Sequence, residues 1–260
     1  MLLPHLRGRV PTLVRAPDGA GGQVFFEKRC PGHRPKWMKT ALVGNYDKHA
    51  GFEGCLVDTL PALIWVANLA ALELHTYQAR VDDLTRPTAL VIDLDPGEPA
   101  TIVDCARVAI DLRDTLEALG LTSVVKTSGS KGLHLSVPLN TPGVTDEATK
   151  SLALALGQLL ESRDPKRVTT VMAKARRRGR VFVDWSQNDR AKTTVAPYSL
   201  RIRPHPLVST PVSWHEIEVV HDRGDGSALS FEAPAALERV GDVGDLYEAN
   251  LTLQQELPAL

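Results

Sequence analysis

The chain has 260 residues, of which 43% are hydrophobic and 23% charged, so it can bury a full core in one large domain or two closely packed lobes. Its formal net charge of -1 argues against a uniformly basic nucleic-acid binder, and no stretch approaches the roughly 20 apolar residues of a membrane helix. Three widely spaced cysteines, without a Cys-x-x-Cys pair, support neither a disulfide framework nor a structural zinc site. We therefore expect a soluble globular protein in a reducing, cytoplasmic setting, with no membrane anchor.

The charges are distributed unevenly along the sequence. Residues 166–203 form a strongly basic tract in which Asp184 and Asp189 are the only acids, whereas acidic residues prevail after residue 215. Taken alone, the Arg-Arg-Arg triplet at 176–178 is more often a solvated surface than a binding site. Its basic neighbours instead favour contact with a polyanion.

The first half of the chain predicts two helices with a strand between them. Asp58 can cap a helix that runs to about His75, because apolar residues recur on one face. The branched apolar run at 88–94 is bounded by Arg-Pro and Asp-Pro-Gly, and it predicts a buried strand. A second helix over 99–119 ends at Gly120.

The second half predicts further strands and helices. Strands at 123–127 and 133–137 are joined by a Ser-Gly-Ser-Lys-Gly turn, and this unit argues against a purely parallel doubly wound sheet. The remaining predicted elements are a helix at 145–162, strands at 181–185 and 195–202, and a helix at 233–249. With no repeat and no long linker, the sequence predicts one compact domain over residues 1–260, of a two-layer α+β (α/β) class.

Three aspartates are the candidate catalytic and metal-binding residues. Asp93 and Asp95 are two apart on a predicted strand, so both carboxylates point to one face while Leu94 points to the core. Asp184 also ends a predicted apolar strand. Such oxygen ligands suit two Mg²⁺ or Mn²⁺ ions, which can clamp the attacking and leaving oxygens of a displacement at phosphorus. Two structural alternatives remain, namely a turn at Asp95 and an ion pair between Asp184 and a nearby arginine.

Residues 127–132 form a glycine- and hydroxyl-rich turn that can bind phosphate. Its backbone N–H groups, with Ser128, Ser130 and the Lys131 ammonium, can converge on triphosphate oxygens. His134 follows on the next strand, opposite its apolar neighbours, and can donate to a phosphate. A plain hairpin with a surface lysine and a surface histidine explains these residues equally well, because the spacing of a Walker A motif is absent.

Aromatic residues are scarce, at 5% of the chain, so the adjacent pair Phe25 and Phe26 is a candidate platform for base stacking. Alternation of side-chain direction would place one ring in the core and leave the other exposed. Cys30 and His33 lack a second pair of ligands, so we set a metal site there aside.

Six segments together resemble one known family. They are FFEK at 25–28, AALELH at 70–75, VIDLDPGE at 91–98, TSGSKGLHL at 127–135, VFVDWSQN at 181–188 and KTTVAPYSLR at 192–201. In this order and spacing they are similar to the polymerase domain of bacterial multifunctional DNA ligase D, a branch of the archaeo-eukaryotic primase superfamily. The resemblance covers nearly the whole chain, and it implies a primase-like catalytic core with an RRM-like sheet and flanking helices.

The resemblance implies a template-dependent nucleotidyltransferase that adds NTPs or dNTPs to a 3′-hydroxyl with two Mn²⁺ or Mg²⁺ ions and readily incorporates ribonucleotides. Asp93, Asp95 and Asp184 fall on the metal-binding carboxylates of the family. The positions that match nucleotide contacts are His75, Ser128, Ser130, Lys131, His134, Lys174, Gln187 and Arg201. The positions that match nucleic-acid contacts are Phe25, Phe26, Lys28, Arg176, Arg177 and Arg178, with the two rings stacking against the template strand.

Departures from the family leave the cellular role open. Many relatives have a segment before the point that corresponds to Met1, and the lysines of that segment contact the 5′-phosphate at a break. We expect no ligase or nuclease domain to be attached to this chain. We therefore expect a stand-alone enzyme of the nucleoid that serves gap filling, end joining or primer synthesis. Its substrates would be gapped, primer-template or broken DNA, and a separate ligase or end-binding protein would be its partner.

Two other functions share part of this pattern. A non-catalytic nucleic-acid-binding module of the same fold would keep the basic groove and the rings but tolerate loss of the aspartates. A two-metal nuclease or phosphatase would share the carboxylates but need neither a triphosphate cradle nor stacking rings. Primer extension with NTPs or dNTPs and Mn²⁺ separates all three.

Overall fold

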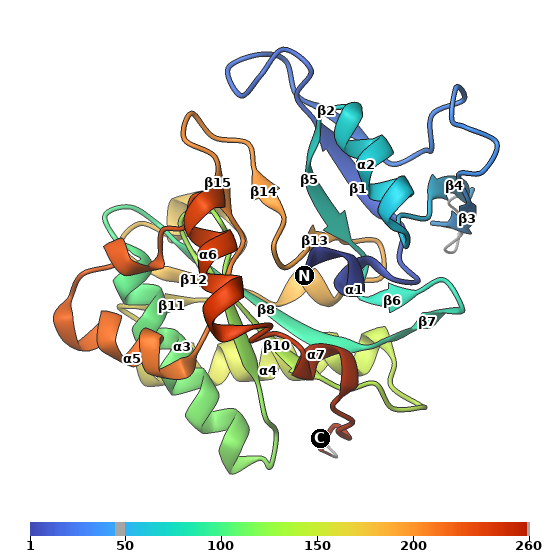
Figure 1. Cartoon of the computed structure of the whole chain (residues 1–260). Coiled ribbons are helices and arrows are strands. Elements are labelled where there is room, and N and C mark those ends of the chain that lie inside the picture. The colour runs from blue at the N-terminus through green and yellow to red at the C-terminus, as the bar shows by residue number, and fades with distance from the viewer. Residues whose placement is uncertain (45–49, 259–260) are drawn as a thin grey trace.

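The computed structural model describes residues 1–44 and 50–258, which build two sheet-centred halves that lie against each other (Figure 1). A six-stranded sheet and its helices form the larger half, and a four-stranded sheet with a short helix forms the smaller half, at the upper right of Figure 1. This mixture of helices and largely antiparallel strands confirms the α+β prediction.

The larger sheet has the strand order β11-β12-β8-β10-β9-β16. Its strands are β8 (Ala89–Pro96), β9 (Val124–Thr127), β10 (Leu133–Pro138), β11 (Val168–Thr169), β12 (Val181–Asp184) and β16 (Pro211–Val212). Neighbouring strands are antiparallel except for the β11–β12 pair. The strands predicted at 88–94, 123–127, 133–137 and 181–185 are therefore confirmed, and the sheet is mixed as the strand-turn-strand unit predicted.

The helix ends follow local capping chemistry. Thr101 and Asp104 form a capping box at the start of α3 (Ile102–Ala118), and Thr145 caps α4 (Asp146–Arg163). The other α-helices are α1 (Leu2–Leu6), α2 (Leu60–Asn68), α5 (Trp214–Arg223), α6 (Ala233–Val243) and α7 (Ala249–Thr252). The helices predicted at 99–119 and 145–162 are thus confirmed.

One face of the larger sheet is apolar and packs on α3 and α4. Leu90, Ile92 and Leu94 alternate along β8 and are fully buried in a core that also contains residues of both helices. Because side-chain direction alternates along a strand, residues 91, 93 and 95 of β8 point to the opposite face. That opposite face is directed toward the smaller half, and it carries the polar residues described below.

The smaller sheet has the strand order β13-β5-β1-β2. Its strands are β1 (Pro11–Arg15), β2 (Phe25–Glu27), β5 (Ala71–Thr76) and β13 (Thr194–Val195). Leu13 of β1 and Leu74 of β5 pack with Val66 of α2 in a second apolar core. Three two-stranded sheets complete the fold, formed by β3 (Thr40–Val43) with β4 (Phe52–Cys55), β6 (Ala79–Arg80) with β7 (Asp83–Pro87), and β14 (Leu200–Arg201) with β15 (Leu207–Val208).

The predicted helix from Asp58 to His75 is wrong in both its start and its length. Thr59, rather than Asp58, caps α2, and the helix ends at Asn68. Ala70 then adopts a positive φ of 56°, which reverses the chain into β5. The apolar residues after this turn fit a strand as well as a helix, because a short apolar run has no decisive periodicity.

Two other predicted elements are each divided in the structure. The expected strand at 195–202 separates into β13 and β14, which belong to different sheets. The expected helix at 233–249 ends at Val243, and after Gly244, with φ of 70°, a separate short helix begins at Ala249. In the described part of the chain, no helix has the length and apolar character needed to cross a bilayer.

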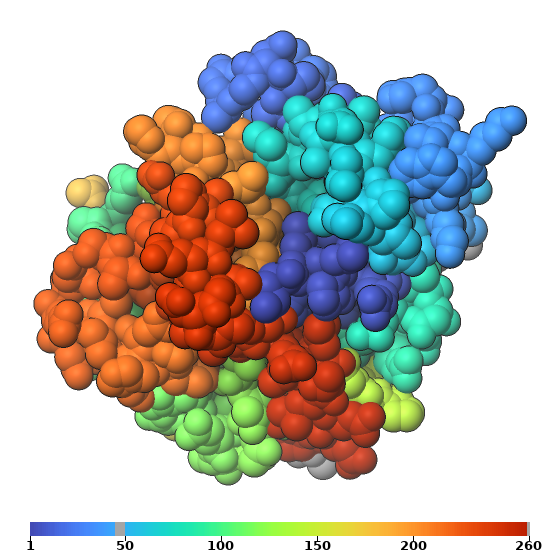
Figure 2. Space-filling model, viewed as in Figure 1, coloured from blue at the N-terminus to red at the C-terminus, as the bar shows by residue number. Residues whose placement is uncertain are grey.

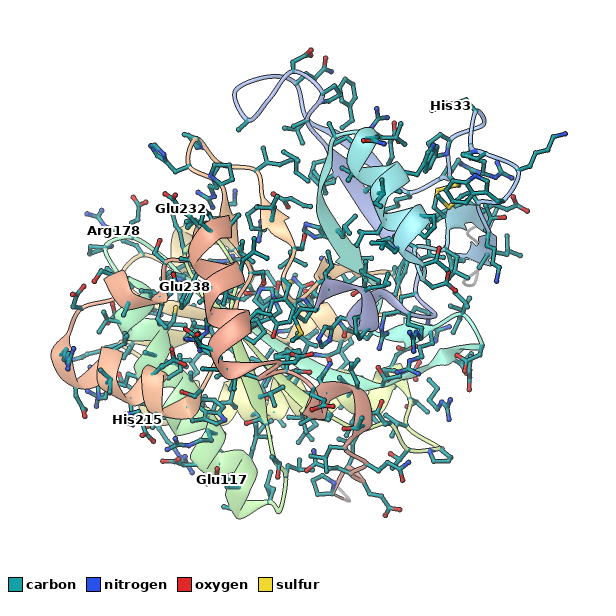
Figure 3. The ribbon with its side chains drawn as sticks, viewed as in Figure 1. His33, Glu117, Arg178, His215, Glu232 and Glu238 are labelled. Carbon is teal, nitrogen blue, oxygen red and sulfur yellow. A yellow bond between two sulfur atoms is a disulfide. The ribbon has the colours of Figure 1, made fainter. Side chains whose placement is uncertain are left out.

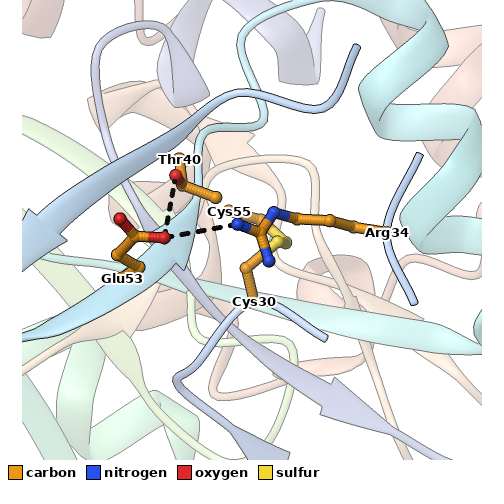
Figure 4. Close-up of a disulfide and its surroundings, with 5 residues drawn as sticks. All are labelled: Cys30, Arg34, Thr40, Glu53 and Cys55. Carbon is orange, nitrogen blue, oxygen red and sulfur yellow. Dashed lines mark hydrogen bonds and ion pairs between the residues drawn. A yellow bond between two sulfur atoms is a disulfide. The ribbon is translucent and has the colours of Figure 1, made fainter. Parts of the chain in front are cut away.

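The structure contradicts the expectation that the cysteines are unpaired. Cys30, after β2, and Cys55, at the end of β4, form a disulfide with their Cα atoms 4.7 Å apart (Figure 4). The Cys30 N–H also donates to the Glu53 carbonyl at 2.8 Å. The two cysteines are 25 residues apart in sequence, and only the packing of β4 beside the loop after β2 brings them together.

We expect the disulfide to stabilise the smaller half measurably. Replacing both Cys30 and Cys55 by serine should lower the free energy of unfolding by about 3 kcal/mol, because the crosslink restricts the unfolded chain. Denaturant unfolding with and without dithiothreitol measures this effect, and the double variant should not respond to the reductant. Alkylation of the unfolded, unreduced chain should modify only Cys105. Three modified thiols would contradict the crosslink.

Candidate active site

A row of polar side chains crosses the larger sheet on the face opposite its apolar core. In the strand registers, Asp93 of β8 lies opposite Asp184 of β12 on one side and opposite His134 of β10 on the other. His134 in turn lies opposite Lys126 of β9. The sequence-predicted carboxylates Asp93 and Asp184 are thus brought together by β-sheet pairing, and Asp95 lies two residues along β8 on the same face.

His134 and Lys126 hold one end of this row. His134 Nε2 lies 3.3 Å from Asp93 Oδ1, and His134 Nδ1 lies 3.1 Å from Lys126 Nζ. Lys126 Nζ also donates to Ser209 Oγ at 2.6 Å. Since the Lys126 ammonium donates to Nδ1, this arrangement fits the tautomer in which Nε2 carries the proton and faces Asp93.

Burial changes the protonation of both groups at this end of the row. Burial and the nearby Arg201 charge lower the pKa of Lys126 to about 7, and the Asp93 charge only partly opposes them. Burial and the Lys126 charge also lower the pKa of His134. The alternative of a surface histidine is wrong, since His134 is only 5% exposed and is already paired with Asp93.

The three carboxylates repel one another in a partly desolvated place. Burial and the charges of Asp93 and Asp184 raise the pKa of Asp95 to about 7. Burial would also raise the pKa of Asp93, but the His134 contact reverses the direction and lowers it. Asp184 is buried and accepts hydrogen bonds from Ser186, at 3.0 Å from N and 2.6 Å from Oγ, and from Gln187 Nε2 at 2.8 Å.

These contacts decide between the alternatives for the aspartates. Among the described residues, Asp184 contacts Ser186 and Gln187 and forms no ion pair with an arginine. Asp95 is the penultimate residue of β8 rather than part of a turn. Among residues 1–44 and 50–258, no three His, Cys, Asp or Glu side chains already surround a metal position. The donor set nevertheless fits a divalent cation, because three clustered carboxylates offer hard oxygen ligands and a positive charge would relieve their repulsion.

The turn between β9 and β10 has the predicted strand-turn-strand setting, but it uses part of its polar groups internally. Ser128 Oγ accepts the N–H groups of Ser130 and Gly132 at 3.2 and 3.1 Å. Ser130 Oγ contacts Arg203, and Lys131 Nζ forms an exposed ion pair with Glu98 at 2.6 Å. The hydroxyl of Ser128 therefore orders the turn, whereas Ser130 and Lys131 remain at its surface.

Gly132 has no room for a side chain. A Cβ at this position would overlap the Leu94 carbonyl oxygen, between the two aspartates of β8. We therefore expect Gly132→Ala to displace the turn from β8, to lower the melting temperature by several degrees and to reduce nucleotide binding. Gly143→Ala is the matched control for a glycine loop change, because a Cβ there meets nothing within 4 Å, although its positive φ adds some strain. Equal melting and nucleotide affinity for Gly132→Ala and the unmodified protein would show that the turn tolerates displacement.

Glu73 joins several predicted nucleotide-binding residues, although the sequence did not single it out. Its carboxylate lies 2.7 Å from His75 Nε2 and 3.0 Å from Arg201 Nε, and it accepts the Ile202 N–H at 2.7 Å. Burial alone would raise the pKa of Glu73, but the His75 hydrogen bond, the Arg201 charge and the Ile202 N–H lower it to about 2. The carboxylate is thus ionised although the residue is only 7% exposed. These partners offset the free-energy cost of burying its charge.

Arg201 connects the smaller sheet to the turn of the larger one. Its Nη1 donates to the Ser128 carbonyl at 2.8 Å while its Nε faces Glu73 of β5. The turn, Arg201 and His75 therefore form one connected unit. A charged residue between apolar neighbours on a strand, as in Ala-Leu-Glu-Leu-His, was the sequence signal that could have identified Glu73.

The remaining predicted residues lie outside this unit. Lys174 and Arg176 are exposed on a short 3-10 turn (Lys174–Arg176), and Arg177 covers the Phe182 ring at 3.6 Å and donates to the Met172 carbonyl. Arg178 is exposed, and in Figure 3 it lies at the opposite edge of the view from His33, which belongs to the loop after β2. The arginine triplet lies between β11 and β12 of the larger half, whereas Lys28 follows β2 of the smaller half, so the predicted basic contacts belong to different halves.

Phe25 and Phe26 differ from the prediction that one ring enters the core. They are 39% and 72% exposed, because β2 is a three-residue edge strand. Lys28, directly after β2, is also exposed. The smaller half thus presents two neighbouring aromatic rings and a cation to its surroundings.

Two cavities lie near these groups, one beside the turn and one beside the row. A cavity of about 380 Å³ lies behind the turn, between Gly129 and Lys131 and the apolar residues Leu229 and Phe231, but none of the three aspartates lines it. A polar cavity of about 40 Å³ lies between the two halves and is lined by Lys126 and His134 together with residues of the smaller half. We therefore define the candidate site by the carboxylate row and the connected turn.

Comparisons with known proteins agree with one another. The family model described as the LigD primase-polymerase domain matches residues 1–247. Similar curated proteins include the multifunctional non-homologous end joining protein LigD of Mycolicibacterium smegmatis, 39% identical over 251 residues, and the multifunctional non-homologous end joining DNA repair protein LigD of Mycobacterium tuberculosis strain H37Rv, 39% identical over 258 residues. Each match covers 95% of this chain but only 31% and 32% of the respective relative, so the chain spans about a third of their length.

A solved structure is similar over almost the whole chain. It is the polymerase domain from Mycobacterium tuberculosis ligase D in complex with DNA, with a TM-score of 0.89 and 38% sequence identity. The similarity covers 98% of this chain and 88% of the other.

Proposed function

The chain belongs to the LigD primase-polymerase family, and on that premise we propose that it is a template-dependent nucleotidyltransferase that adds NTPs or dNTPs to a 3′-hydroxyl. Family membership implies metal-dependent nucleotidyl transfer. We place its work in DNA gap filling, end joining or primer synthesis, with a nucleoid setting and with a ligase activity or an end-binding protein acting beside it. We further propose that residues 1–260 act as a single catalytic domain whose larger sheet is the RRM-like sheet of archaeo-eukaryotic primases.

The observation that carries this proposal is the row of Asp184, Asp93 and His134 across β12, β8 and β10, with Asp95 on the same face. Three carboxylates lie together on a polar face, and the pKa of Asp95 is raised to about 7. A bound cation would stabilise the ionised form of all three. A binding module that contacts only the backbone of DNA has no use for such a cluster, because phosphates repel it.

Asp93, Asp95 and Asp184 would hold two divalent ions, Mn²⁺ or Mg²⁺, which when bound activate the primer 3′-hydroxyl and neutralise charge on the triphosphate. Lys126 and His134 hold Asp93 from one side, and Ser186 and Gln187 hold Asp184 from the other. These neighbours fix where the carboxylate oxygens point, and this is how the chain itself contributes to catalysis by positioning.

The nucleotide would lie between the carboxylates and the turn. Ser128 and Gly132 order the turn, Ser130 and Lys131 present donors at its surface, and Arg201 fixes the turn to the smaller half. Lys174, Gln187, His75 and His134 complete the set of proposed nucleotide contacts. Since phosphoryl and nucleotidyl transfers depend mainly on alignment and charge, a connected set of donors is the feature such a reaction needs.

DNA would approach from the smaller half and from the arginine triplet. We propose that Phe25 and Phe26 stack on the template strand, because both rings are exposed on an edge strand. Lys28 and Arg176, Arg177 and Arg178 would contact phosphates, although Arg177 also packs on Phe182.

A primer-extension assay tests the proposal. The purified chain is incubated with a labelled primer-template, Mn²⁺ and either NTPs or dNTPs, and products are resolved on a denaturing gel. Template-directed additions are expected, and their sequence must follow the template base. DNA binding without extension would instead indicate a non-catalytic module, and shortening of the primer would indicate a nuclease. Gapped duplexes with and without a 5′-phosphate, beside an unprimed strand, then separate gap filling, end joining and priming.

A further inference from the structure

A loop of the smaller half combines strong positive charge with an exposed tryptophan. We call residues 28–39 the tethered loop. It contains no acidic residue, and its cations are Lys28, Arg29, Arg34, Lys36 and Lys39, with His33 and Trp37 between them. In Figure 2 this segment, in light blue, stands out from the body at the upper right.

The backbone of the tethered loop is firmly held. The disulfide ties Cys30 to Cys55, and the Cys30 N–H donates to the Glu53 carbonyl. Arg34 and Thr40 both contact the Glu53 carboxylate at 3.3 Å (Figure 4). At the far end of the loop the Leu56 N–H donates to the Lys39 carbonyl at 2.9 Å.

Side chains of the loop anchor it as well. Met38 is buried in the core of the smaller half, and the His33 ring lies 6.1 Å from the Trp65 ring of α2. A loop with these anchors keeps its shape before a partner arrives, so that little conformational entropy is lost on binding.

The same loop leaves its most interactive groups uncovered. Trp37 is 53% exposed, although its neighbour Met38 is buried. Lys28, Lys36 and Lys39 are exposed, and among the described residues none of the three has an ion pair. The loop thus presents a large aromatic ring beside exposed cations, and these are the two kinds of group that contact the bases and phosphates of a single strand.

The tethered loop continues the surface of the proposed template platform. An open depression of about 650 Å³ is lined without interruption by residues 26–32, from the exposed Phe26 ring to Gly32 in the loop. Trp37 does not line this depression, but it follows Gly32 within the same tethered loop.

We propose that the tethered loop binds the single-stranded part of the template after it passes Phe25 and Phe26. The inference rests on the proposed polymerase function and names a further segment of its nucleic-acid surface. A single strand has phosphates that Lys36 and Lys39 can contact, and it has unpaired bases on which Trp37 can stack. The depression that runs from Phe26 into the loop favours a single strand over a folded acidic protein, because Phe26 is proposed to stack on the template.

The experiment measures DNA affinity without nucleotide, so it does not depend on catalysis. Fluorescence anisotropy is recorded over a range of KCl concentrations for two probes, a duplex with a 5′ template overhang of about eight nucleotides and the same duplex with blunt ends. The variants are Trp37→Ala and the pair Lys36→Ala with Lys39→Ala. The controls are Leu237→Ala and Arg107→Ala, an exposed apolar residue and an exposed cation elsewhere on the surface.

For the overhang probe, Trp37→Ala is expected to weaken binding about tenfold. The lysine pair is expected to lower the slope of log affinity against log salt by about 1.4, because each contact to a single strand contributes about 0.7. Blunt-duplex binding should change by less than about twofold, as should both probes with the controls.

Equal affinity and slope for the variants and the unmodified protein would overturn the inference while leaving the polymerase proposal intact. Equal losses on both probes would also overturn it, since the loop would then contact duplex. If the unmodified chain binds neither probe, the proposed function itself fails.

Discussion

Asp93→Asn is expected to reduce nucleotide addition by at least about a thousandfold while leaving the fold intact. Asp93 lies at the centre of the polar row, opposite Asp184 on one side and His134 on the other. Asparagine keeps the size of the side chain but removes the charge that a divalent cation would need. It also relieves repulsion on Asp95, whose pKa is raised partly by the Asp93 charge, but it removes the charge that faces His134. These two effects on the free energy of unfolding oppose each other, so we expect only a small change in melting temperature.

Asp184→Asn is expected to give the same loss of activity by a different structural route. Its carboxylate is the acceptor for Ser186 and Gln187, and an amide can accept only part of those bonds. A small loss of stability is therefore expected beside the catalytic loss. Single-turnover extension in Mn²⁺, together with melting temperatures, separates these effects.

Asp189→Asn is the matched control for both variants. Asp189 follows β12, the strand that ends at Asp184, and its carboxylate pairs with Lys150 Nζ at 2.9 Å. It lies outside the carboxylate row. It should extend primers at the rate of the unmodified chain. If Asp93→Asn or Asp184→Asn also extended primers robustly, the assignment of these carboxylates to metal binding would be wrong.

The sequence predicted best those parts of the site that depend on local periodicity. Alternation along β8 correctly places Asp93 and Asp95 opposite the buried Leu94. The β9-β10 hairpin is also local, because glycine-rich turns between short apolar runs have few other conformations. Predicting that Asp184 lies opposite Asp93 requires knowing that β12 pairs with β8, and neither residue spacing nor composition determines that strand order.

The sequence predicted less well the contacts between segments that are far apart. Lys126 was missed although it interrupts the apolar strand Val124–Thr127, because its partner Ser209 lies 83 residues later. A charge in a buried strand requires a partner, so the position of Lys126 between Val125 and Thr127 was itself a signal in the sequence. The disulfide was missed for a related reason, since Cys30 and Cys55 meet only after β4 packs beside the loop following β2.

The second large effect is expected at Arg201, which binds two parts of the site at once. Arg201→Leu should raise the KM for the incoming nucleotide by about tenfold to a hundredfold, because the turn loses the donor to the Ser128 carbonyl. The same change leaves the buried Glu73 carboxylate without its ion pair at 3.0 Å. His75 and the Ile202 N–H still contact that carboxylate, so we expect a loss of about 2 kcal/mol in unfolding free energy.

A second substitution separates the structural effect of Arg201 from its effect on nucleotide. In Arg201→Leu with Glu73→Gln, the buried charge is removed, and the lost stability should largely return. The raised KM should not return, because the turn still lacks its donor. Recovery of both quantities would show that Arg201 only neutralises Glu73. If neither recovers, the Glu73 contact does not explain the lost stability. Recovery of stability alone identifies Arg201 as the residue that holds the nucleotide turn against the smaller half of the molecule.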